Sequence, residues 1–172
     1  MMAAAVASNL GQSVLIIEHN KELGKKLKIT GGGRCNILNA EYDTELLLSN
    51  YGKSKRYLQG TFSVFGVTET VEFFKNIGID IKIEDRKRAF PVTEKAIDVY
   101  KALESVIKNN NVEILLNSKV ININSIKLEK NMQSITGIEI MGSDKTTKII
   151  SAKRYILSTG GLSHRETGST GD

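Results

Sequence analysis

The sequence predicts an α/β fold in which a parallel β-sheet with helices is joined to an antiparallel β-meander. An alanine-rich, helix-prone segment at residues 2–10 leads directly into an apolar strand at 13–18. An amphipathic helix at 95–109 leads into a second buried strand at 112–116. Between 119 and 151, three short segments of alternating polarity are separated by turn-forming residues, which is typical of a β-meander.

Composition limits the class of protein. With 172 residues, of which 40% are hydrophobic and 25% charged, the chain is long enough for one well-packed domain. The apolar run at 14–17 is far shorter than the roughly 20 residues that a membrane-spanning helix needs, so we expect no membrane partner. Cys35 is the single cysteine, which excludes an internal disulfide and fits a reducing cytoplasm.

The chain is basic, with a net charge of +5 and a pI near 9.2. Such a charge suits a polyanionic partner, either RNA or a cofactor that carries phosphate. The basic clusters at 21–28 and 86–88 are interleaved with acidic residues, however, and a solvated surface explains them equally well. Charge alone therefore does not identify a binding partner.

The remaining elements follow from periodicity and turn residues. We expect helices at 43–58 and 67–77, followed by a short strand at 80–84. A final core strand is expected at 154–158. The helix at 2–10 and the strand that follows it form the second half of a βαβ unit, which makes the fold Rossmann-like.

Glu18 is the first residue with a chemical implication. An acidic side chain at the carboxyl end of a parallel strand can accept hydrogen bonds from both hydroxyls of a ribose. An ordinary surface glutamate is the alternative, and nicotinamide, flavin and adenosylmethionine binders all use such an acid. The glycine-rich turn that normally precedes this helix would lie before Met1, so we expect the first strand and that turn to be missing from the chain.

The run Gly31-Gly32-Gly33-Arg34-Cys35-Asn36 is the most informative motif. Three consecutive glycines expose amide N–H groups that a pyrophosphate or a flavin edge could use, and Arg34 would add a positive charge. A flexible connecting loop is the alternative. Cys35 is either a small packing residue or a reactive thiol with a lowered pKa.

A second cluster of small residues follows the last expected strand. Thr159, Gly160 and Gly161 remove bulky side chains where a ligand or another backbone would approach. The segment 168–172 does the same, and the Asp172 carboxylate could accept a hydrogen bond from a ribityl or ribose hydroxyl. A purely structural turn remains the alternative.

Three segments together carry a family resemblance: residues 24–36, residues 90–96, and Thr159-Gly160-Gly161 with 167–172. They resemble the BaiN/RdsA family of bacterial NAD(P)/FAD-dependent oxidoreductases, also described as aminoacetone-oxidase-family FAD-binding enzymes. The resemblance covers essentially the whole chain. It implies a Rossmann-like FAD-binding domain and FAD as the cofactor, with NAD(P)H as a candidate electron donor.

The resemblance also implies a set of cofactor-binding residues. Glu18 would bind the adenosine ribose, the backbone of Val120 would meet adenine, and the Gly31–Asn36 loop would line the pyrophosphate and flavin. Two C-terminal groups complete the set: Thr159, Gly160 and Gly161, and Thr170, Gly171 and Asp172. No catalytic side chain is assigned, since the cofactor performs the hydride chemistry. Neither His19 nor His164 has partners at metal-ligand spacing, so no metal site is expected.

The resemblance further implies that residues 1–172 are a partial FAD-binding domain. Members of the family continue into an inserted β-rich substrate domain, and Ser163-His164-Arg165 departs from their usual Ser-aromatic-Pro. We therefore expect the chain alone to hold FAD poorly. The family's substrates are unsaturated steroid-like molecules or uridine in ribosomal RNA. The alternatives are a non-catalytic or truncated nucleotide-binding module and an adenosylmethionine-dependent transferase.

Overall fold

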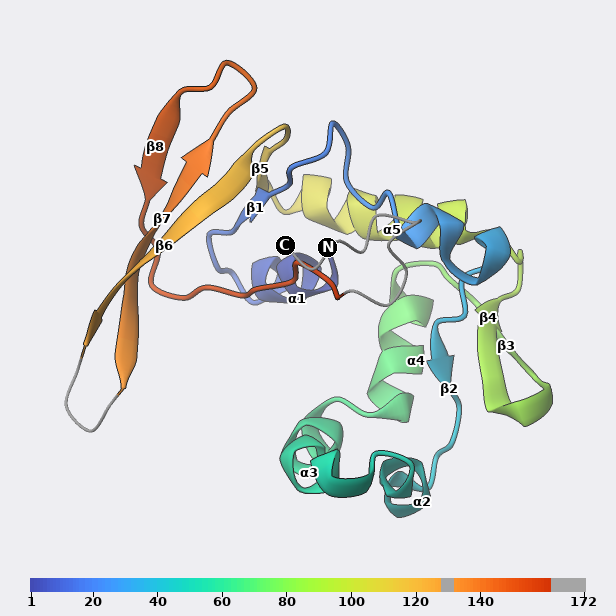
Figure 1. The fold of residues 1–172 in the computed structure, drawn as a ribbon. Helices are drawn as coiled ribbons and strands as arrows, with labels where there is room; N and C mark the ends of the chain where they lie inside the picture. The colour runs from blue at the N-terminus through green and yellow to red at the C-terminus, as the bar shows by residue number, and fades with distance from the viewer. Residues whose placement is uncertain (128–131, 162–172) are drawn as a thin grey trace. The chain divides into compact units, whose positions relative to one another are not determined.

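The computed structural model describes residues 1–127 and 132–161 (Figure 1). The chain divides into two compact units. The first comprises Met1–Lys26 and Ile107–Asp172, and the second comprises Leu27–Val106.

The first unit contains the predicted helix-to-strand element and its parallel partner. Helix α1 (Met2–Asn9) ends at Gly11, whose φ of +74° suits glycine, and leads into β1 (Leu15–Ile17). Strand β5 (Glu113–Leu115) pairs with β1 in parallel. The predicted α/β class with a parallel pair is therefore confirmed.

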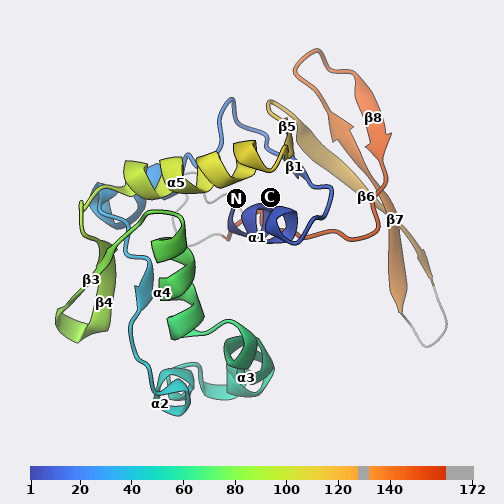
Figure 2. The same cartoon turned by 180° about the vertical axis from the view of Figure 1, so that it is seen from behind.

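The β-meander is also confirmed. Strands β6 (Lys119–Lys127), β7 (Gln133–Met141) and β8 (Thr147–Ile150) form one antiparallel sheet in the order β6-β7-β8 (Figure 2). The pairing of β6 with β7 is irregular between Val120 and Asn122, where one residue is skipped. Such a bulge leaves one residue out of the ladder and bends the strand.

The strand predicted at 154–158 is wrong. This segment has no regular secondary structure, and its apolar residues Ile156 and Leu157 are 69% and 65% exposed. Apolar content favours a strand only when a neighbouring strand supplies hydrogen bonds. The parallel sheet of the described residues consists of β1 and β5 alone, so the segment has no partner there.

The second unit is built on a three-stranded antiparallel sheet. Its order is β2 (Leu38–Asn39), β4 (Arg88–Pro91), β3 (Ile81–Glu84), and only β3 was expected from the sequence. Three helices belong to this unit: α2 (Thr44–Ser49), α3 (Lys55–Val64) and α4 (Val67–Asn76). Helix α5 (Ala96–Asn109) begins in the second unit and ends in the first.

The single helix predicted at 43–58 is two helices. Helix α2 ends at Asn50, whose side chain donates to the Leu46 and Leu47 carbonyl oxygens at 3.2 Å each. Gly52 then takes a φ of +52°, which an α-helix cannot include. A short 3₁₀ turn at Gly52–Ser54 precedes α3, so asparagine and glycine together interrupt the helix.

Apolar burial explains why the helices pack as they do. The second unit has a small core of β-sheet and helix residues: Ala40, Leu47, Val67 and Ala89, with Leu38, Phe62 and Ile81 packed against them. The predicted apolar face of α5 is confirmed, because four of its residues are at most 4% exposed: Ala96, Val99, Leu103 and Ile107. The spacing of three or four residues places them on one side of the helix. The other two residues of that face, Tyr100 and Val106, are half-buried.

Replacing Leu48 by alanine is expected to lower the free energy of unfolding by about 2–5 kcal/mol, because Leu48 is fully buried and alanine leaves a cavity. Leu46→Ala is the matched control, since Leu46 lies on the same helix but is 53% exposed. Its effect should stay within about 0.5 kcal/mol. Chemical denaturation measures both. Equal losses would contradict the assignment of Leu48 to the core.

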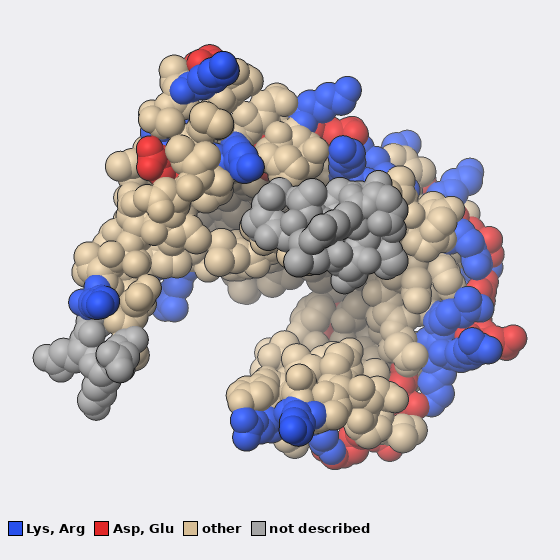
Figure 3. Space-filling view, in the orientation of Figure 1, with Lys and Arg blue, Asp and Glu red and all other residues tan. Residues whose placement is uncertain are grey.

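Charged side chains are interleaved on the surface. In the view of Figure 3, acidic and basic residues alternate beside the β3–β4 hairpin. Lys87 pairs with Glu41 there, and Arg88 lies 3.8 Å from Glu84. Among the described residues, no helix has the length and apolar character needed to cross a membrane.

Candidate nucleotide-binding site

Glu18 lies directly after β1, at the carboxyl end of the parallel pair. Its carboxylate is 25% exposed and binds the turn that follows: Oε1 accepts from the Asn20 backbone N–H at 2.9 Å and from the Asn20 amide at 2.7 Å. A carboxylate has about four acceptor positions, two on each oxygen. Both of these bonds fall on Oε1, so Oε2 is the oxygen with room for hydroxyl donors.

The start of α1 lies near this carboxylate. Burial lowers the pKa of the Met1 amine, and the negative charge of Glu18 acts on it in the opposite direction. The N-terminal end of a helix carries a partial positive charge. The carboxyl end of β1 therefore combines an acceptor for hydroxyl groups with a helix end that favours an anion.

The segment after β5 lies against the same strand end. The Ser118 N–H donates to the Glu18 carbonyl oxygen at 3.0 Å, and the Glu18 N–H donates to the Leu115 carbonyl oxygen at 2.9 Å. Val120 follows two residues later, at the start of β6 and beside the skipped position of the meander. The structure thus brings Glu18 next to Ser118, which lies two residues before Val120.

Thr159, Gly160 and Gly161 are exposed, and Gly160 has a φ of +85°. A Cβ added at Gly160 would lie 4.0 Å from Nζ of Lys26, so a lysine of the same unit approaches this backbone. Sequence reasoning did not single out Lys26. The other predicted C-terminal residues, Thr170, Gly171 and Asp172, lie outside the described residues.

The triple-glycine loop belongs to the second unit. Gly31, Gly32 and Gly33 have φ values of +61°, +66° and +89°, a left-handed backbone that other residues rarely adopt. A Cβ at Gly31 would lie 3.1 Å from the Asn36 nitrogen, which is tighter than ordinary contact. A Cβ at Gly32 or Gly33 would have no atom within 4 Å. Gly31 is therefore required by the loop's own packing, and the other two face open space.

Cys35 and Asn36 anchor the end of the loop. Cys35 is 3% exposed, and burial raises the pKa of its thiol. This environment fits the packing role rather than a reactive thiolate. The Asn36 amide, oriented to satisfy its hydrogen bonds, donates to the carbonyl oxygens of Leu38 at 3.1 Å and Ala89 at 3.2 Å. These bonds attach the loop to β2 and β4.

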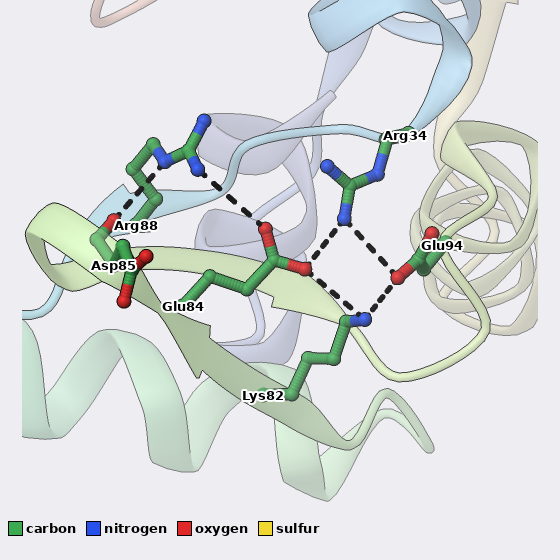
Figure 4. Close-up of polar contacts among 6 residues, drawn as sticks. All are labelled: Arg34, Lys82, Glu84, Asp85, Arg88 and Glu94. Atoms are coloured by element: carbon green, nitrogen blue, oxygen red, sulfur yellow. Dashed lines mark hydrogen bonds and ion pairs between the residues drawn. The ribbon is translucent and has the colours of Figure 1, made fainter.

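Arg34 lies in a square of alternating charges (Figure 4). Its Nη2 is 2.6 Å from Glu84 and 3.1 Å from Glu94, and Nζ of Lys82 binds the same two carboxylates. The guanidinium also stacks on the Phe90 ring, with 4.2 Å from Cζ to the ring centroid. The sequence suggested that the positive charge of Arg34 would face a phosphate. In the structure this charge is instead paired with two carboxylates of the protein itself.

Two cavities border other residues. One of about 250 Å³ lies beside Leu116 and Ser118, and one of about 240 Å³ lies beside Leu47 and Phe62. Neither is lined by a predicted cofactor-binding residue. The predicted cofactor-binding residues lie outside both cavities.

Stability should depend on pH through this square of charges. The Arg34 guanidinium lowers the pKa of Glu84, and the Lys82 ammonium lowers that of Glu94. The ionised carboxylates therefore contribute stability above the ordinary carboxyl pKa, and this contribution is lost as pH falls through the lowered values. Thermal unfolding followed from neutral to acidic pH should show the loss. A Glu84→Gln/Glu94→Gln variant should show a shallower dependence, and an unchanged slope would contradict the assignment.

The chain matches a known protein family and several characterised proteins. The family model described as the HI0933-like protein Rossmann domain matches residues 1–172. Among curated proteins, the 3-dehydro-bile acid delta(4,6)-reductase of Clostridium scindens is 29% identical over 168 residues, which are 98% of this chain and 37% of the relative.

Two further relatives are named ribosomal RNA dihydrouridine synthase. The ribosomal RNA dihydrouridine synthase of Haemophilus influenzae is 24% identical over 170 residues, which are 99% of this chain and 40% of that protein. The one from Escherichia coli is 23% identical over 163 residues, 95% of this chain and 37% of that protein. The chain thus spans from 37% to 40% of the length of these relatives.

A solved structure shares the fold. The crystal structure of Thermovibrio ammonificans THI4 matches with a TM-score of 0.61 and 11% identity, over 92% of this chain and 52% of that chain. At this level of identity the match concerns the fold alone.

Proposed function

Because this chain belongs to the HI0933-like Rossmann domain family, we propose that it is the FAD-binding portion of a flavin-dependent oxidoreductase. The observation that carries the proposal is the end of β1. There the Glu18 carboxylate accepts both Asn20 bonds on Oε1, which leaves Oε2 outside them, and its charge acts on the Met1 amine at the start of α1. A nucleotide with a ribose and a pyrophosphate has the groups that this arrangement recognises.

The residues present fit such a cofactor. Glu18 would hold the adenosine ribose, the backbone near Val120 would meet adenine, and the open side of Gly32 and Gly33 would allow close approach of the pyrophosphate or flavin. Thr159–Gly161 would contribute a second surface of small residues. When bound, FAD would supply hydride transfer, and the protein would position it.

Flavin binding is tested on the full 172-residue chain. We expect the chain to bind added FAD only weakly, so binding is followed by equilibrium dialysis at high FAD concentration. The bound flavin is read from its absorbance band near 450 nm, roughly where oxidised flavins absorb. ADP should compete with FAD because it shares the ribose and pyrophosphate, whereas S-adenosylmethionine should not. Binding of S-adenosylmethionine in preference to FAD would favour the transferase alternative.

The electron donor and substrate form the finer part of the proposal. NAD(P)H is proposed as the donor, with either an unsaturated steroid-like small molecule or uridine in ribosomal RNA as the acceptor. The names of the relatives support both classes. Bleaching of the flavin band by NADPH or NADH under anaerobic conditions tests the donor. Stable flavin binding without reduction would favour a non-catalytic nucleotide-binding module.

A further inference from the structure

The triple-glycine loop needs an external support to keep its shape. Three consecutive glycines have the largest backbone freedom of any sequence, so their left-handed conformation costs entropy unless other contacts hold it. The Cys35 N–H donates to the Thr30 carbonyl oxygen at 2.9 Å and closes the loop on itself. Arg34 and Asn36, which follow the glycines, supply side-chain contacts to the rest of the second unit.

Among these contacts, those of Arg34 reach residues that are far away in the sequence. Its guanidinium reaches Glu84 at the end of β3 and Glu94 just before α5, residues 50 and 60 positions along the chain. Glu94 has a φ of +55°, an uncommon conformation for glutamate, and its carboxylate nevertheless meets both Arg34 and Lys82. The square thus joins two separate segments of the unit, β3 and the turn before α5, to the loop (Figure 4).

Phe90 completes the attachment from β4. The Arg34 guanidinium lies over its ring, and a Cβ built at Gly31 would lie 3.8 Å from the same ring. Phe90 is 4% exposed, so it is a fixed surface. One aromatic ring therefore contacts the arginine that follows the three glycines and borders the space beside the first glycine.

Arg34 could either bind a phosphate of the cofactor or hold the loop in place, and its ion pairs distinguish these two roles. A guanidinium that binds a phosphate needs unpaired N–H donors directed at the ligand. Here Nη2 donates toward two carboxylates, and Nε is buried without a hydrogen-bond partner among the described residues. With Lys82, the square contains two positive and two negative groups and has no net charge.

We propose that Arg34 is a positioning residue: it holds the triple-glycine loop in its cofactor-accepting shape by pairing with Glu84 and Glu94, and it does not contact the cofactor's phosphates. This inference rests on the proposed function, because the loop is taken to receive FAD. It predicts that the two acidic residues are as important for flavin binding as the arginine.

The two roles predict opposite effects of neutralising the carboxylates. If Arg34 positions the loop, Glu84→Gln and Arg34→Gln should each raise the Kd for FAD by roughly 3- to 10-fold, and the double variant should be no weaker than either one. If Arg34 binds phosphate directly, Glu84→Gln should leave the affinity unchanged or improve it, because it frees the guanidinium. The second result would overturn the proposal.

Arg34→Lys provides an independent discrimination. Lysine keeps the positive charge and binds phosphate well, but it lacks the planar group that stacks on Phe90 while reaching both carboxylates. We expect Arg34→Lys to bind FAD as weakly as Arg34→Gln and to shift the visible flavin spectrum. Wild-type affinity in Arg34→Lys would contradict the positioning role.

A measurement without ligand separates this inference from the proposed function. Amide hydrogen exchange at residues 30–36 should be faster in Arg34→Gln and in Glu84→Gln than in the wild type. Glu45→Gln is the matched control, because Glu45 also pairs with a lysine in the second unit but lies on α2. If wild-type chain binds no FAD while exchange still accelerates, the flavin proposal fails and the attachment of the loop stands. Unchanged exchange in both variants would refute the attachment itself.

Discussion

Gly32→Val is expected to abolish FAD binding while the protein keeps its secondary structure. A Cβ at Gly32 meets nothing within 4 Å in the protein, so valine creates no internal clash. Its branched side chain would instead occupy the space from which the cofactor approaches the loop. Equilibrium dialysis with FAD measures the loss of binding, and far-ultraviolet circular dichroism measures the secondary structure.

Gly32→Val also lowers the stability of the protein by straining the backbone, and this effect needs a separate control. Valine at the Gly32 φ of +66° destabilises the protein by roughly 1–2 kcal/mol because the left-handed region is unfavourable for branched residues. Gly78→Val carries a similar cost, since Gly78 has a φ of +85° and also has nothing within 4 Å of an added Cβ. Gly78 ends α4, outside the proposed site. Normal flavin content in Gly32→Val would show that the loop only connects two elements.

Glu18→Ala is expected to raise the Kd for FAD by roughly 10²-fold or more. The substitution removes two charge-assisted hydrogen bonds to the ribose, each contributing about 1.5–3 kcal/mol. Isothermal titration with FAD measures the change, and titration with flavin mononucleotide, which lacks the adenosine, should show no comparable loss.

The turn after β1 provides the control for Glu18. Alanine at position 18 also releases Asn20, which donates two hydrogen bonds to the carboxylate. Asn20→Ala removes the side-chain bond of this turn and keeps the carboxylate. If Asn20→Ala weakens FAD binding as much as Glu18→Ala, the glutamate acts by shaping the turn, and its assignment to the ribose is wrong.

The elements that the sequence predicted are those held together by local pattern. The apolar residues of α5 recur every three or four positions, and the alternating segments of the meander need only short turns between them. The family was also predicted correctly, because the Gly31–Asn36 motif is specific as a string of residues.

The errors concern structure that depends on distant partners. Strands β2 and β4 pair across about 50 residues and are only two and four residues long, so neither has a recognisable period. Conversely, the segment 154–158 has the composition of a strand and no strand beside it among the described residues. Strand formation is decided by the neighbour as much as by the residues themselves.

The charge square was missed for the same reason. Its four members come from three separate places in the chain, and sequence spacing does not relate Arg34 to Glu94. One local signal existed: Lys82 and Glu84 are two apart on a strand, so their side chains share a face. That pattern would have indicated a charged surface opposite the loop, although not the arginine that completes it.

The burial of Cys35 makes the loop chemically observable. It is the single thiol in 172 residues, and it is shielded at the end of the triple-glycine segment. A disulfide-exchange reagent can react only when this segment opens, so the rate of colour release reports the frequency of opening. Added cofactor that closes over the loop should slow that reaction, whereas a ligand bound elsewhere should not. The reaction rate of Cys35 therefore measures how often the triple-glycine loop opens, without any label or mutation.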